Sequence, residues 1–141
     1  MKIVINSKHG GFQLSDEAIL RYAELKGLKV WVEQDAKFKS LTHHWTVPPE
    51  ERMSFPENAV WATLSMDERQ ALNKKYGSQQ IYERDLERDD PILVQVVEEL
   101  GDRCRTQVSS PKVVEIPDDV EWTIEEYDGL EWVAEVHRTW S

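Results

Sequence analysis

Two arginines and a tyrosine in the middle of the chain are the residues best suited to hold a nucleotide. Tyr82, Arg84 and Arg88 lie just before a predicted helix start. A guanidinium can bind a phosphate through two parallel hydrogen bonds, and an aromatic ring can stack on a base. The same pattern permits a structural interpretation, in which the arginines form local ion pairs with Asp85 and Asp89.

The C-terminal residues repeat this combination of a guanidinium and an aromatic ring. Arg138 is the only basic residue among positions 113–141, which hold nine acidic residues. Trp140 stands two positions later. We expect Arg138 either to pair with a carboxylate such as Glu135 or to bind an anionic ligand together with Trp140.

A glycine pair follows the first predicted strand. Gly10 and Gly11, between Lys8 and Phe12, precede a predicted helix, and such a loop can present backbone N–H groups to a phosphate. The sequence matches neither G-x-G-x-x-G nor G-x-x-x-x-G-K-[ST], so a plain tight turn is the alternative. The candidate ligand-binding residues are thus Lys8, Gly10, Gly11, Phe12, Tyr82, Arg84, Arg88, Arg138 and Trp140.

No catalytic or metal-binding constellation is visible in the sequence. His43 and His44 are adjacent, so their side chains diverge, while His9 and His137 stand alone. Cys104 lies between two arginines, which would lower its pKa if the thiol were exposed. We interpret it as an incidental thiol. The sequence predicts no metal, no cofactor and no catalytic residue.

Composition limits the classes of partner. The chain has 141 residues, 27 acidic and 17 basic side chains and a net charge of −10, so it repels duplex nucleic acid and anionic membranes. Its single cysteine excludes an intrachain disulfide and favours a reducing compartment. No apolar run approaches the ~20 residues of a membrane span. We expect one cytoplasmic domain, residues 1–141.

Helix-capping residues and the spacing of apolar residues predict the helices and strands that position these candidate residues. Ser15 and Gly27 bound one helix, and Ser65 caps a second. Asp128-Gly129 between two β-prone runs predicts a hairpin. Expected strands lie at 2–6, 29–33, 81–83, 113–116, 121–127 and 130–136, and expected helices at 16–26, 66–76 and 91–100. The fold is predicted to be α+β, a small mixed sheet with two or three helices and a C-terminal β-hairpin, or else a small three-layer α/β domain.

The segment 34–58 is the least regular part of the chain. It carries Trp45 and Phe55 among three prolines. We predict a long loop or arm, and loops of this length are usually functional, disordered or packed on a partner. Because two large aromatic rings need burial that an exposed loop does not give, we expect the protein to be at least a dimer.

Motifs at both ends and in the middle of the chain form a specific set. They are Met1-Lys2-Ile3-Val4-Ile5-Asn6, Gly10-Gly11-Phe12, Leu14-Ser15, Arg84-Asp85, Arg88-Asp89-Asp90-Pro91, Val113-Val114-Glu115-Ile116-Pro117-Asp118-Asp119, Glu126-Tyr127-Asp128-Gly129 and His137-Arg138-Thr139-Trp140. This set resembles the first-described family of Thoeris anti-defence sponges, which are small phage proteins. The resemblance covers both ends and residues 84–100, whereas residues 34–80 match nothing in that family.

The resemblance implies a non-catalytic protein of the host cell cytoplasm. Such sponges sequester cyclic nucleotide signals, notably cyclic ADP-ribose isomers and, in some members, cyclic oligonucleotides. Capture of the signal keeps the host's defence effector inactive. The family assembles into homo-oligomers, dimers or hexamers built from dimers, with sites at subunit boundaries.

Two other functions are open on the residues alone. A phosphodiesterase or nucleotide hydrolase could use carboxylates such as Asp89 and Asp90 to degrade the same signals. An inhibitor of another protein could use the acidic C-terminal segment to imitate nucleic acid. A sponge returns its ligand unaltered and a hydrolase returns product, whereas salt-sensitive binding to a basic protein would favour the inhibitor.

Overall fold

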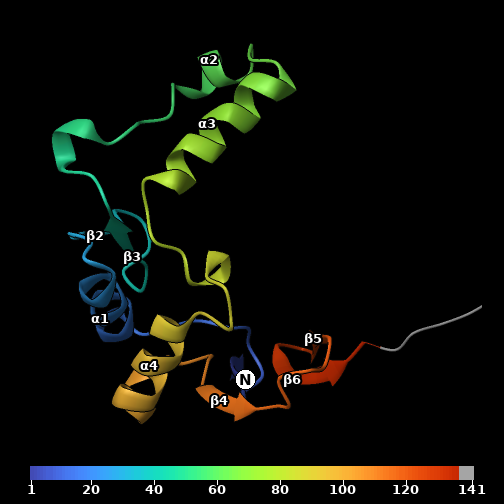
Figure 1. Cartoon of the computed structure of the whole chain (residues 1–141). Helices are drawn as coiled ribbons and strands as arrows, with labels where there is room; N and C mark the ends of the chain where they lie inside the picture. Colours follow the sequence, from blue (N-terminus) through green and yellow to red (C-terminus); the bar gives the residue numbers. More distant parts are fainter. Residues whose placement is uncertain (137–141) are drawn as a thin grey trace, which may run out of the picture. The chain divides into compact units, whose positions relative to one another are not determined.

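The computed structural model describes residues 1–136, and its fold is α+β (Figure 1). These residues form four α-helices and six strands, which pair into three two-stranded antiparallel sheets. The chain divides into two compact units. Unit 1 holds residues 1–26 together with those from 83 onward, and unit 2 holds residues 27–82.

Unit 1 is built around its first strand. Its elements are β1 (Lys2–Asn6), α1 (Asp16–Lys26), η2 (Glu83–Asp85), α4 (Pro91–Leu100), η3 (Gly101–Cys104), β4 (Pro111–Glu115), β5 (Trp122–Tyr127) and β6 (Leu130–Glu135). Strand β1 pairs antiparallel with β4, and helix α4 packs against β1, β4 and α1. Ile3 and Val4 of β1 and Leu93 of α4 are completely buried. The continuous apolar run of β1 is thus explained by burial on both faces.

Helix α4 begins and ends where its sequence predicts. The side chain of Asp90 caps it by accepting a hydrogen bond from the Ile92 N–H at 2.9 Å, and Pro91 occupies the first helical position. Gly101 follows the last turn with a φ of 55°, a backbone conformation that costs glycine little. Leu93, Val96 and neighbouring apolar residues then face the core.

The predicted C-terminal hairpin is confirmed. Strands β5 and β6 pair antiparallel, with Tyr127 opposite Leu130. Asp128 and Gly129 between them have φ values of 52° and 90°, and the favoured two-residue hairpin turn needs a positive φ at both positions.

Unit 2 combines a short hairpin with one long helix. Its elements are β2 (Trp31–Gln34), β3 (Thr42–Trp45), η1 (Pro49–Glu51), α2 (Asn58–Trp61) and α3 (Met66–Ser78). The predicted capping box of α3 is present, since Ser65 Oγ accepts from the Glu68 N–H at 3.1 Å and the Glu68 carboxylate accepts from the Ser65 N–H. Trp45 is buried, and its ring meets that of Tyr76 edge to face at 5.5 Å.

Several sequence expectations differ from the structure in their detail. In place of one mixed sheet there are three separate antiparallel pairs, and β1 and β2 belong to different units. The segment 34–58 is not one long loop, because it contains β3. Residues 81–83 form no strand, and the only pairing near them is an isolated bridge between Trp45 and Gln80. The partner of β1 is β4, which lies more than 100 positions further along the chain.

The burial of Trp45 changes the argument for a dimer. Its ring is covered within unit 2 by Tyr76 and by Arg52, whose guanidinium lies 5.0 Å from the ring centroid. Burial of this residue therefore does not require a second subunit. Among residues 1–136, no helix is long and apolar enough to cross a bilayer.

Candidate functional site

The glycine loop of unit 1 lies against the β5–β6 turn. Gly10 donates its N–H to the Asp128 carbonyl at 3.1 Å, and a Cβ added to Gly129 would overlap the backbone nitrogens of Gly10 and Gly11. A Cβ on Gly10 would lie 2.6 Å from the Val108 carbonyl oxygen. The described contacts therefore give this loop a packing role, as the tight-turn alternative expects.

We expect Gly10→Ala to lower the free energy of unfolding by about 2–3 kcal/mol. Stability is lost for two reasons. The φ of 132° is one that L-residues rarely adopt, and the added Cβ would clash with the backbone of Val108. Gly11→Ala is the matched control, since Gly11 has a φ of 93° but nothing within 4 Å of its added Cβ. Its cost should be about 1 kcal/mol. Equal urea midpoints for the two variants would contradict the packing role.

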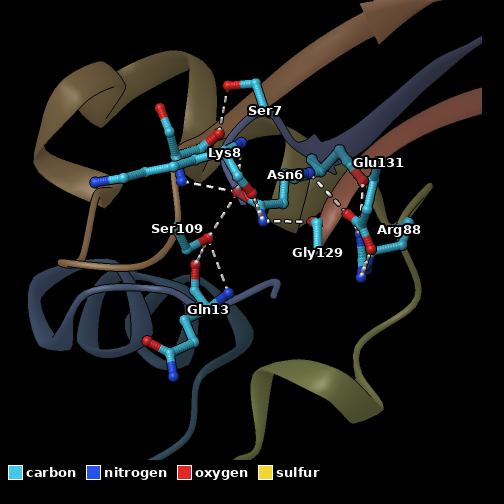
Figure 2. A network of polar contacts seen from close by, with 10 residues as sticks. Asn6, Ser7, Lys8, Gln13, Arg88, Ser109, Gly129 and Glu131 are labelled. Carbon is cyan, nitrogen blue, oxygen red and sulfur yellow. Dashed lines mark hydrogen bonds and ion pairs between the residues drawn. The ribbon is translucent and has the colours of Figure 1, made fainter. Parts of the chain in front are cut away.

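A buried polar network centred on Asn6 connects the glycine loop to the rest of unit 1 (Figure 2). The Asn6 amide nitrogen donates to the carbonyls of Lys8 at 2.6 Å and Gly129 at 2.8 Å. Its oxygen accepts from Lys8 N–H at 3.2 Å, Ser110 N–H at 2.9 Å and Ser109 Oγ at 3.2 Å. One side chain thus joins β1, the glycine loop, the hairpin turn and the start of β4.

Arg88 is held between a carboxylate and an aromatic ring. Its Nη1 and Nη2 donate to the two oxygens of Glu131 at 2.7 and 2.9 Å, and Nη1 also donates to the Val4 carbonyl at 3.2 Å. Its guanidinium carbon lies 3.7 Å from the centroid of Phe12, a cation–π contact. The side chains of Arg88 and Glu131 are only 17% and 9% exposed. We call the stacked residues the Arg88–Phe12 pair.

The other predicted site residues are placed as follows. Lys8 donates from Nζ to the Gln107 carbonyl at 2.8 Å, and Figure 2 shows Lys8 and Arg88 on opposite sides of Asn6. Arg84 is exposed in η2, and Tyr82 belongs to unit 2. Two further predicted site residues, Arg138 and Trp140, lie outside the described residues.

Asp90, one of the two carboxylates named for the hydrolase alternative, has a structural role. Besides capping α4, it accepts a hydrogen bond from Tyr22 Oη at 2.6 Å and lies 3.3 Å from Lys26 Nζ. Burial opposes ionisation of this carboxyl, but the bonds from Tyr22, the Ile92 N–H and Lys26 outweigh it and lower its pKa. A carboxylate with three partners already bound is poorly placed to abstract a proton from a substrate.

Cys104 is buried and is not an activated thiol. Burial raises the pKa of the Cys104 thiol to about 11, so the flanking arginines do not activate it. Residues 1–136 contain no group of three or more His, Cys, Asp and Glu side chains suited to holding a metal ion.

Sequence reasoning missed a cavity of about 510 Å³ in unit 2. It is lined by Glu33, Gln34, Asp35, Ala36, His43, Trp45, Pro49, Arg52, Met53, Ser54, Phe55 and Tyr76. The signal that could have found it was the pair of aromatic residues in a segment taken for a loop. Its walls come from β2, β3, the segment after η1 and helix α3.

Two hydrogen-bonded pairs set the charge of this cavity. Arg52 Nη1 donates to Glu33 Oε2 at 2.9 Å. His43 lies between Asp35 Oδ2, 2.9 Å from its Nε2, and Gln80 Oε1, 3.1 Å from its Nδ1. Each acidic residue therefore has a basic partner within the same unit.

We expect the Asp35 carboxyl to titrate well below an ordinary aspartate. The hydrogen bond with His43, followed by those from the N–H groups of Phe38 and Lys37, lowers its pKa to about 2. Because an unfolded aspartate titrates near pH ~3.9, the stability gained from ionised Asp35 is complete above that pH and is lost as pH falls toward 2.

Carboxyl ¹³C NMR through an acid titration measures this pKa directly. His43→Ala should move the pKa of Asp35 upward, toward the usual value, whereas His9→Ala in unit 1 should leave it unchanged. An Asp35 midpoint that does not respond to His43→Ala would contradict the assigned cause.

The chain was also compared with known proteins. No protein-family model, curated protein or solved structure matches it.

Proposed function

We propose that the protein is a non-catalytic anti-defence sponge that binds and sequesters a cyclic nucleotide signal. The single observation that carries the proposal is the preassembled Arg88–Phe12 pair, in which the guanidinium stacks 3.7 Å above the ring. A cyclic nucleotide offers both phosphate and base, so its site needs a guanidinium and an aromatic ring together. Because Arg88 covers one face of Phe12, the base would stack on the other face of the ring. The ligand class, cyclic ADP-ribose isomers and cyclic oligonucleotides, comes from the family resemblance.

Arg88 has donors to spare for such a ligand. A guanidinium carries five N–H groups, and the described residues accept three hydrogen bonds from it, one to Val4 and two to Glu131. We propose that the two N–H groups with no acceptor among these residues bind a phosphate oxygen. Glu131 fixes the orientation of the guanidinium, so little side-chain entropy is lost when a ligand binds.

Binding without turnover is favoured over hydrolysis because Asp90 is committed to Tyr22, Lys26 and the α4 cap. We further propose that the protein acts in the host cytoplasm as a dimer or hexamer. Light scattering on the free and ligand-bound protein measures the oligomeric state, and a monomer under both conditions would contradict this part.

The deciding experiment incubates the full chain with a cyclic ADP-ribose isomer, denatures the protein and analyses the released small molecule by chromatography. A sponge returns the ligand unaltered, whereas a linear or hydrolysed product would establish the enzyme alternative. Phe12→Leu removes the aromatic face but keeps an apolar side chain, so affinity should fall by about tenfold. Phe38→Leu, at an exposed position of unit 2, is the matched control.

A further inference from the structure

We propose that the cavity of unit 2 is a second binding site, for an uncharged planar heterocycle with two adjacent N–H donors, as guanine presents at its pairing edge. The site consists only of residues between 27 and 82. It shares no residue with the Arg88–Phe12 pair, so it stands or fails independently of the proposed function.

One wall of the cavity offers an aromatic ring for stacking. Phe55 is 41% exposed and lines the cavity. It is held by Tyr76, with ring centroids 4.9 Å apart, and by Trp61, which it meets edge to face at 5.6 Å. The face of Trp45 is already covered by Arg52. Phe55 is therefore a fixed and partly open ring on which a planar ligand can stack.

The two carboxylates of the cavity, those of Asp35 and Glu33, differ in the number of hydrogen bonds that they can still accept. Asp35 Oδ1 already accepts from the N–H groups of Lys37 and Phe38, and Oδ2 is paired with His43. Glu33 accepts one bond at each oxygen, from Trp45 Nε1 to Oε1 at 3.2 Å and from Arg52 Nη1 to Oε2 at 2.9 Å.

Each oxygen of Glu33 therefore keeps one acceptor position, because a carboxylate oxygen can accept two hydrogen bonds. The side chain is 44% exposed, so these positions are open to a ligand. Two parallel acceptors match two adjacent N–H donors, which favours a ring N–H beside an exocyclic amino group. Asp35 lacks this arrangement because one of its oxygens is saturated.

The charges that line the cavity favour an uncharged ligand. Glu33 is compensated by Arg52, and Asp35 is paired with His43. A phosphate in the cavity would be repelled by the carboxylates of Glu33 and Asp35, whereas an uncharged ring avoids this repulsion between like charges. The volume of about 510 Å³ lies within the range of small-molecule pockets.

The test on the unaltered full chain is calorimetric titration with guanosine, inosine and 1-methylguanosine. Inosine lacks the exocyclic amino group and 1-methylguanosine lacks the ring N–H, so each should bind about tenfold or more weakly than guanosine. Guanosine 5′-monophosphate should bind no more tightly than guanosine. The proposal is overturned if guanosine gives no binding at millimolar concentration, or if inosine or 1-methylguanosine binds equally well.

Two variants locate the site. Phe55→Ala should weaken guanosine binding by about ten- to a hundredfold, whereas Phe38→Ala, 63% exposed in the same unit and absent from the cavity wall, should not change it. Glu33→Gln keeps the side-chain shape and should abolish the preference for guanosine over inosine. An unchanged preference in Glu33→Gln, or equal losses in Phe55→Ala and Phe38→Ala, would refute the assignment.

The outcomes for the two sites can be separated. Phe55→Ala should leave cyclic ADP-ribose binding unaffected if that ligand occupies unit 1, and Phe12→Leu should leave guanosine binding unaffected. Failure of either ligand to bind therefore bears on one site and not on the other.

Discussion

Asn6→Ala is expected to destabilise the protein by about 3–5 kcal/mol, because five hydrogen bonds meet at one fully buried side chain. Truncation leaves the carbonyls of Lys8 and Gly129 and the N–H of Ser110 without their described partner. Each buried polar group that loses its hydrogen-bond partner costs about 1–3 kcal/mol of stability. Water that enters the site would offset part of this cost. Urea unfolding followed by circular dichroism measures the loss.

The matched control is Ser7→Ala at the neighbouring position. Its hydroxyl is exposed and donates one hydrogen bond, to the Ser110 carbonyl at 2.9 Å. We expect its loss to cost about 1 kcal/mol or less. Comparable destabilisation by the two substitutions would show that the network centred on Asn6 does not act as a unit.

Glu131→Ala is the second substitution with a large expected effect, again about 3–5 kcal/mol. It removes the two carboxylate oxygens that accept from Arg88 Nη1 and Nη2, and it leaves Nη1 only the Val4 carbonyl. It also removes the acceptor of the Asn6 N–H, which lies 2.7 Å from Glu131 Oε1. A half-buried guanidinium would then lack its counter-charge. The exposed pair between Lys2 and Glu98 is the control, and Glu98→Ala should cost about 1 kcal/mol or less.

A double substitution distinguishes the effect of losing the Arg88–Glu131 ion pair from the effect of leaving the Arg88 charge without its partner. Arg88→Met with Glu131→Leu removes both charges and leaves apolar side chains, so it should be more stable than Glu131→Ala alone. A double variant as unstable as the single one would mean that the packing of these residues matters more than their charges. Cyclic nucleotide binding should be lost in the double variant because its guanidinium is gone.

What the sequence predicts well is local. The α3 capping box, the Asp90 cap and the Asp128-Gly129 turn depend on residues within four positions of one another, and all three are present. Their hydrogen bonds are determined by local backbone geometry, so the residue types alone indicate them.

The sequence does not predict which residues far apart in the chain contact one another. Arg88 had two aspartates nearby in the chain, yet it binds Glu131, which the hairpin brings to β1. Many carboxylates in an acidic chain could satisfy one guanidinium, and only the packing of β1 against β6 selects among them. Trp45 and Phe55 indicate in the sequence that the unit 2 cavity has aromatic walls, but not that Glu33, Arg52 and Tyr76 also line it, because these residues converge only through tertiary structure.

Unit 1 consists of two chain segments that are separated by unit 2, so it cannot fold until late in synthesis on the ribosome. Residues 1–26 pack against residues that follow unit 2 in the sequence, so these partners are synthesised much later. The Met1 N-terminal amine, for example, donates to the Ile116 carbonyl, 115 positions later. Unit 2 is continuous, so all of its contacts become possible once residue 82 has left the exit tunnel. Strand β1, apolar and unpaired, stays exposed through most of translation. A nascent chain stalled near position 100 should therefore be bound by chaperones through its first strand, and chains released past position 135 should not.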